Sequence, residues 1–135
     1  MFCFLLSLAF PAFADEAIAE ACLKTKIWEG YNTGWAVRTA TATTLGEGEH
    51  RIYLVTLYAG NEYQILACGD QEFTNADIVL YDSLGNEVMR DTKGDREPLI
   101  SYKATATDTF YIAVHATKLI TSDKKGGIAT AVTYK

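Results

Sequence analysis

Residues 109–116 read TFYIAVHA, and this stretch decides the fold. Large apolar side chains occupy every second position, which is the spacing of a β-strand with one buried face. The expected inner face is Phe110, Ile112 and Val114, and the expected outer face is Tyr111, Ala113 and His115. We therefore predict a central strand of a half-buried sheet.

Further short runs rich in Thr, Tyr, Val and Ile lie on both sides of this strand, and turns rich in Gly and Asn separate them. The predicted strands cover residues 35–44, 51–57, 63–68, 77–81, 87–89, 99–103, 109–116 and 128–133. About eight short strands at close spacing are typical of a β-sandwich or jelly roll. We predict an all-β domain over residues 35–135.

The first fourteen residues carry no charged side chain and have the features of a secretory signal peptide. An apolar run, residues 2–10, precedes Ala12-Phe13-Ala14, which resembles a signal-peptidase site. We predict cleavage between Ala14 and Asp15 and an exported mature chain, periplasmic or extracellular. The missing Lys or Arg at the start leaves open a start codon upstream of Met1.

A short helix is predicted to follow in residues 15–34, with Asp15 as its N-cap and a connector behind it. Ile18, Ala21 and Cys22 have the spacing of one apolar helix stripe. Removal of the signal peptide leaves two cysteines, Cys22 and Cys68, in an oxidising compartment. We predict a disulfide between them, with a free thiol as the alternative. Cys68 lies on the outer face of its expected strand, so a bridged helix would cover that face.

Much of the chain from Arg51 to Thr133 resembles the bacterial pre-peptidase C-terminal domain. The segments that carry the resemblance are 57–60 (LYAG) with Tyr63, 68–70 (CGD), 77–82 (DIVLYD) with Gly85-Asn86, 100–102 (ISY) and 106–114 (ATDTFYIAV). The family more often has glycine where Asp108 stands. The resemblance implies a β-sandwich with a non-catalytic accessory role in an exported protein.

Charge and composition exclude two classes of function. The chain has a net charge of −5, and its Lys and Arg residues are scattered, so the basic patch of a nucleic-acid-binding protein is missing. Residues 15–135 contain no apolar run long enough for a transmembrane helix. The sequence leaves the oligomeric state open.

The densest group of possible metal ligands is an acidic loop, residues 70–77. Its hard oxygen ligands are Asp70, Glu72, Asn75 and Asp77, which suit Ca²⁺, although the spacing is not that of an EF-hand. Such side chains more often cap turns through their own backbone. The loop is therefore predicted as a turn, with calcium as the alternative; no other cofactor is expected.

Two sets of residues are candidates for a binding surface. Trp28, Tyr31 and Trp35 form an aromatic cluster that packs the junction of helix and sandwich or, alternatively, binds a sugar or a protein. Tyr111 and His115 are expected on an open sheet face.

The two histidines, His50 and His115, occur without a nucleophile-elbow motif, so we expect no enzyme. The predicted function is a non-catalytic binding or accessory module for a protein or carbohydrate partner. The alternative is a small secreted hydrolase or enzyme inhibitor that uses the acidic loop from Asp70 to Asp77.

Overall fold

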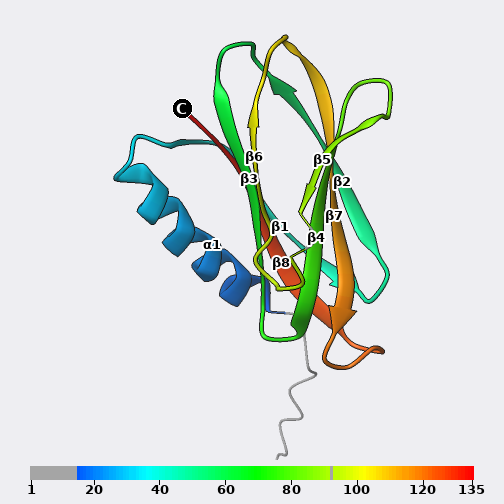
Figure 1. The fold of residues 1–135 in the computed structure, drawn as a ribbon. Coiled ribbons are helices and arrows are strands. Elements are labelled where there is room, and N and C mark those ends of the chain that lie inside the picture. The colour runs from blue at the N-terminus through cyan, green and yellow to red at the C-terminus, as the bar shows by residue number, and fades with distance from the viewer. Residues whose placement is uncertain (1–14, 92) are drawn as a thin grey trace, which may run out of the picture.

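The computed structural model describes residues 15–91 and 93–135, which form a two-layer β-sandwich with one helix on its side (Figure 1). The predicted signal peptide, residues 1–14, lies outside the described residues. The elements are α1 (Glu16–Tyr31), β1 (Ala36–Gly46), β2 (His50–Leu57), β3 (Glu62–Gly69), β4 (Phe73–Tyr81), β5 (Glu87–Asp91), β6 (Leu99–Lys103), β7 (Asp108–Leu119) and β8 (Lys125–Tyr134). The predicted strands and fold class are confirmed.

Each layer is a four-stranded antiparallel sheet. Sheet A has the strand order β1-β8-β3-β6, and sheet B has the order β2-β7-β4-β5. The alternation in β7 places side chains as expected, since Phe110, Ile112 and Val114 are buried in the core between the sheets. Tyr111 and His115 lie on the opposite face and are half-buried.

Helix α1 lies against the outer face of sheet A and packs mainly on β8, β1 and β3 (Figure 1). Asp15 is its N-cap as predicted, because its carboxylate accepts a hydrogen bond from the backbone N–H of Ile18 at 3.1 Å. The predicted apolar stripe was wrong in part. Ile18 is 45% exposed and Ala21 is exposed, whereas Ala19 and Leu23 are the buried helix residues.

A row of small residues on β8 lets the helix approach closely. Gly127, Ala129 and Ala131 share the outer face of this strand, and both alanines pack against the helix. A Cβ atom at Gly127 would lie 2.6 Å from the backbone nitrogen of Glu16. The start of α1 therefore contacts the sheet backbone directly, and this contact turns the Ala19–Leu23 side of the helix inward.

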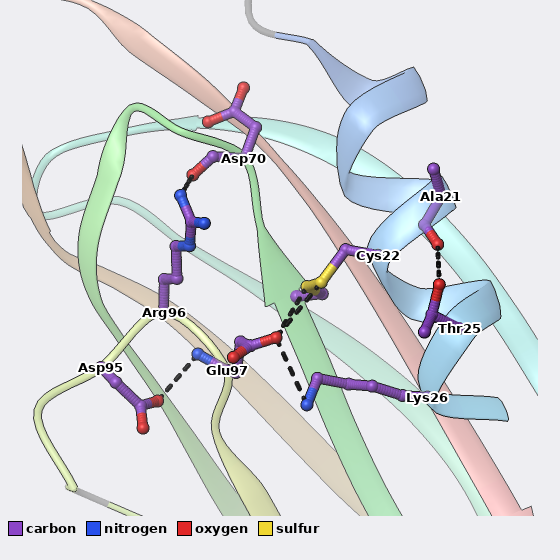
Figure 2. The surroundings of a disulfide bond; sticks show 9 residues. Ala21, Cys22, Thr25, Lys26, Asp70, Asp95, Arg96 and Glu97 are labelled. Carbon is purple, nitrogen blue, oxygen red and sulfur yellow. Dashed lines mark hydrogen bonds and ion pairs between the residues drawn. A yellow bond between two sulfur atoms is a disulfide. The ribbon is translucent and has the colours of Figure 1, made fainter. Parts of the chain in front are cut away.

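A disulfide joins the middle of α1 to β3, as predicted. Cys22 and Cys68 are bonded with their Cα atoms 6.0 Å apart (Figure 2). The Oε1 atom of Glu97 lies 3.3 Å from the Cys22 sulfur and also 3.3 Å from Lys26 Nζ. Disulfide sulfurs carry no hydrogen, so the polar partner of Glu97 at this place is Lys26. The helix is thus attached to the sandwich by a covalent bond and an ion pair.

The carboxylate of Asp70, in the turn after β3, connects three segments of the chain. Its Oδ2 accepts hydrogen bonds from the backbone N–H groups of Asp15 and Gly127, both at 2.8 Å. Its Oδ1 accepts one from Glu72 at 2.9 Å. Arg96 donates to the backbone carbonyl of Asp70 at 3.3 Å (Figure 2). Asp70 therefore fixes the helix start and β8 to the β3–β4 turn.

Within the described residues, α1 is not long and apolar enough to cross a membrane, and it is the single helix there.

Replacing both cysteines, C22S/C68S, should lower the free energy of unfolding by about 4 kcal/mol, because the disulfide closes a loop of roughly 47 residues in the unfolded chain. The melting temperature of the oxidised wild type and of the double variant measures this loss. A reduced wild type is the matched control and should melt with the variant. Equal melting temperatures for the oxidised wild type and the variant would contradict the prediction.

Candidate binding surface

The outer face of sheet B differs from that of sheet A because no described helix covers it. Residues directly opposite each other on antiparallel strands share one face, so the pairs Ile52–Ala113 and Leu54–Tyr111 place four of its side chains. Val79 and Tyr81 of β4 complete the set through their pairs with Ala113 and Tyr111. We call this set the open face: Ile52, Leu54, Val79, Tyr81, Tyr111 and Ala113.

The open face has buried apolar residues at its base and exposed apolar side chains above them. Val79 and Ala113 are buried, and Tyr81 and Tyr111 are half-buried. Ile52 is 50% exposed and Leu54 is 65% exposed. A contiguous exposed apolar group of this kind, edged by polar residues, is typical of a site that contacts a partner. The continuous apolar run at residues 52–55 is the sequence signal for it, because apolar residues at successive strand positions must lie on both faces.

A row of ionisable residues borders the open face at one end. His50 is paired with His115 across β2 and β7, and His115 is paired with Asp77 across β7 and β4. The two imidazole ring centroids are 5.3 Å apart. A shallow depression of about 330 Å³ lies here, lined in part by Asp77, Arg90 and His115. The open face therefore combines apolar contact area with groups that can donate and accept hydrogen bonds.

Electrostatics in this row favour a neutral His115. Burial lowers the pKa of His115, and the neighbouring His50 lowers it further, while Asp77 acts in the opposite direction. The Oδ1 atoms of Asp77 and Asn75 are buried and have no hydrogen-bond partner among the described residues. Two buried acceptors near the row of ionisable residues are thus unsatisfied within the described part of the chain.

The residues of the acidic loop predicted from sequence lie in two different elements, a turn and a strand. Asp70 is 1% exposed, and its carboxylate oxygens accept hydrogen bonds from backbone N–H groups. The turn prediction is wrong for Asn75, because β4 begins at Phe73, four residues before the predicted start, and carries both Asn75 and Asp77. Among the described His, Cys, Asp and Glu residues, the structure gathers no group of three that includes Asp70, Glu72 or Asp77. The turn-capping interpretation fits Asp70, and calcium binding stays a prediction.

The ligand atoms that do gather in the described ranges belong to Cys22, Cys68 and Glu97. The two sulfurs are bonded to each other. A metal ligand is a thiolate, and a disulfide supplies none, so this group is structural in the oxidised protein.

The aromatic cluster is placed differently from the favoured prediction. Trp28 is 66% exposed and Tyr31 is 64% exposed, so neither packs the junction of helix and sandwich. Their rings meet edge to face with centroids 5.9 Å apart. Trp35 is half-buried, with the Lys135 ammonium 5.9 Å from its ring centre. The packing prediction is therefore wrong for Trp28 and Tyr31, because the small residues on β8 direct the other side of α1 inward.

The His115 environment predicts a specific titration. We expect the pKa of His115 to lie below the ordinary histidine value, H50Q to raise it in part, and D77N to lower it further. NMR titration of the His115 imidazole in the wild type and in each variant measures these shifts. Because the folded pKa is lowered, this residue destabilises the fold as pH falls from 6.5 through that pKa. Shifts of the same sign in H50Q and D77N would contradict the assignment.

Calcium binding by residues 70–77 has its own test. If these oxygens bind Ca²⁺, millimolar Ca²⁺ raises the melting temperature by mass action and EDTA reverses the rise. D77N should abolish the effect, and D95N, which changes an acidic residue outside the loop, should leave it intact. An unchanged melting temperature in Ca²⁺ and in EDTA would exclude the site.

Comparison with protein-family models and with curated protein sequences finds no match. Solved structures match by fold. One is the pre-peptidase C-terminal domain of collagenase from Bacillus anthracis, with 13% identity, a TM-score of 0.55, and coverage of 71% of this chain and 89% of that chain. Another is PliG of Aeromonas hydrophila, a periplasmic inhibitor of g-type lysozyme, with 15% identity, a TM-score of 0.56, and coverage of 76% and 90%.

These matches concern the fold, since identities this low carry no residue-level correspondence. The resemblance to the pre-peptidase C-terminal domain, first indicated by segments such as 106–114, is confirmed at that level. One of the two similar structures is a domain of a collagenase, and the other is an inhibitor of a lysozyme. The chain has the β-sandwich fold of the pre-peptidase C-terminal domain.

Proposed function

We propose that this chain is an exported, non-catalytic module that binds a protein partner through the open face of sheet B. The observation that carries the proposal is the difference between the two sheets. One outer face is covered by a disulfide-bonded helix, whereas the other exposes Ile52 and Leu54 above an apolar floor. Apolar side chains exposed to water are unfavourable, and a partner bound to that face would bury them.

The comparisons support a non-catalytic role. PliG is an inhibitor of another protein, a g-type lysozyme, and the other similar structure is the pre-peptidase C-terminal domain of a collagenase. The disulfide supports an oxidising, exported location. The net charge of −5 favours a basic partner, because opposite charge speeds the encounter of two proteins. A g-type lysozyme is therefore the first candidate partner to assay.

The open face suits a protein better than a small substrate. Its depression is shallow, and its apolar residues lie on three adjacent strands, β2, β7 and β4. Enzyme pockets for small molecules usually enclose most of the ligand, whereas protein interfaces use broad surfaces with an apolar centre and a polar rim. In this arrangement Leu54 and Tyr111 provide the centre, and Asp77, Arg90 and His115 provide the rim.

Site-specific photo-crosslinking tests the surface in the exporting cell. A photoreactive residue at position 54 should crosslink to a discrete partner, and one at position 18, exposed on α1, should not. L54E should abolish capture from a probe at position 52 and weaken the purified complex at least about tenfold, because a charge replaces a desolvated anchor. The melting temperature should not change, since Leu54 is largely exposed.

Two outcomes would contradict the proposal. The first is crosslinking from position 18 that equals or exceeds crosslinking from position 54. The second is a complex whose affinity is unchanged by L54E. Inhibition of a g-type lysozyme by the wild-type chain and its loss in L54E would identify the module as an inhibitor. Full binding without inhibition would identify an accessory module.

A second candidate function is carbohydrate binding by the pair Trp28 and Tyr31. Exposed aromatic rings on a helix surface can stack on the apolar face of a sugar ring. A glycan that binds there should change tryptophan fluorescence in the wild type and leave W28A unchanged. W35F is the matched control and should retain the response, because Trp35 is half-buried beside Gly30 and is not a member of the Trp28–Tyr31 ring pair. A response that persists in W28A would exclude this site.

A further inference from the structure

The buried carboxylate of Asp70 has no cationic partner. Asp70 is 1% exposed, and its oxygens are served by three backbone N–H groups. None of the ion pairs among the described residues includes it. The nearby Arg96 donates instead to its backbone carbonyl. A buried charge that is solvated only by neutral donors is stabilised further when a cation joins them.

One of those three donors is the nitrogen atom that signal-peptide cleavage would release. The backbone nitrogen of Asp15 lies 2.8 Å from Asp70 Oδ2. Hydrolysis of the Ala14–Asp15 bond by an export peptidase adds one water, leaving a carboxylate on Ala14 and an amine on Asp15. The amine takes up a proton and becomes an α-ammonium group at neutral pH. The same atom then carries three N–H donors and a positive charge.

We propose that Asp70 is the receptor for the α-ammonium group of Asp15, and that processing at the Ala14–Asp15 bond completes the fold by forming this ion pair. The proposal rests on the predicted cleavage position and does not depend on the function proposed for the open face. The first residue of the mature chain then has a structural role. The processed form is the stable one, and any form extended beyond Asp15 has the hydrogen bond without the charge.

Most of the charged groups around the Asp15 nitrogen would stabilise a positive charge on it. Three carboxylates stabilise an ammonium there: that of Asp70, that of Asp15 itself, and that of Glu16, which accepts a hydrogen bond from Thr44. The positive end of the α1 dipole and the guanidinium of Arg96 oppose it. With Asp70 in direct contact, we expect the pKa of the α-amine to rise above its ordinary value.

The backbone around this place prevents the ammonium from moving away. A Cβ at Gly127 would lie 2.6 Å from Glu16 N and 2.7 Å from the carbonyl carbon of Asp15, so the start of α1 is pressed against β8. The N–H of Gly127 also donates to the same Asp70 oxygen at 2.8 Å. The position of the ammonium is thus set by contacts that already exist in the fold.

The experiment compares two purified forms that differ at the N-terminus. One begins at Asp15, and the other retains Ala12–Ala14. At pH 6 the form that begins at Asp15 should melt roughly 3–6 °C higher, the shift expected of one additional charged interaction in a domain of this size. The advantage should be full well below the ordinary α-amine pKa of about 7.7–8.0, where the amine is protonated even when unfolded. It should be lost as the pH rises through the raised pKa of the folded amine.

Asp70→Asn provides the matched background, because the amide removes the charge and keeps a hydrogen-bond acceptor. In this background the two N-terminal forms should melt together at all pH values. Should the variant not fold, NMR titration of the wild-type α-amine gives the independent readout, with a pKa above the ordinary α-amine value expected.

Three outcomes would overturn the proposal. They are equal melting temperatures of the two wild-type forms at pH 6, a difference that persists in Asp70→Asn, and an α-amine with an ordinary pKa. Mass spectrometry of the exported protein tests the remaining premise, and a mature N-terminus at a residue other than Asp15 would also overturn it. A failure here leaves the crosslinking test of the open face unaffected.

Discussion

The rest of the structure depends on one buried carboxylate, that of Asp70. It holds together three segments that are far apart in the sequence: the start of α1, the β3–β4 turn and the Gly127 position of β8. Removing the side chain would leave the buried N–H of Gly127 without an acceptor, at about 1–3 kcal/mol, and would also free the part-buried N–H groups of Asp15 and Glu72. The hydrogen bonds fix where the helix begins, and the disulfide then fixes its middle. Neither constraint alone sets both the position and the rotation of the helix.

The fixed helix makes the two outer faces of the sandwich chemically different. On sheet A, Leu23 of α1 covers the small residues of β8 and the outer side of Leu66, and removes that apolar area from water. On sheet B, the equivalent area is occupied by Ile52, Leu54 and Tyr111. No element among the described residues covers them. The polar row of His50, His115 and Asp77 then limits the open face on one side. This asymmetry is the physical basis of the proposed binding function.

The two similar structures show that this fold alone does not determine function. A domain of a collagenase and an inhibitor of a lysozyme each match the fold of this chain at about the same TM-score. The strands are required for a closed core such as that around Ile112 and Tyr63, and many sequences satisfy this requirement. Specificity must therefore reside in surface positions that the core does not constrain, which in this chain include the exposed residues of β2.

The sequence by itself determined what depends on local spacing. The alternation in residues 109–116 predicted the buried face of β7, the side chain of Asp15 predicted the helix start, and the even cysteine count predicted the Cys22–Cys68 bond. Tertiary structure decided the rest. The inward side of α1, the exposure of Trp28 and the use of Asp70 by distant backbone groups all depend on which segments meet in space. A helix with weak amphipathicity takes its rotation from the surface that it packs on, here the small residues of β8 and a covalent bond, and an acidic side chain takes its role from donors that lie more than fifty residues away in the chain.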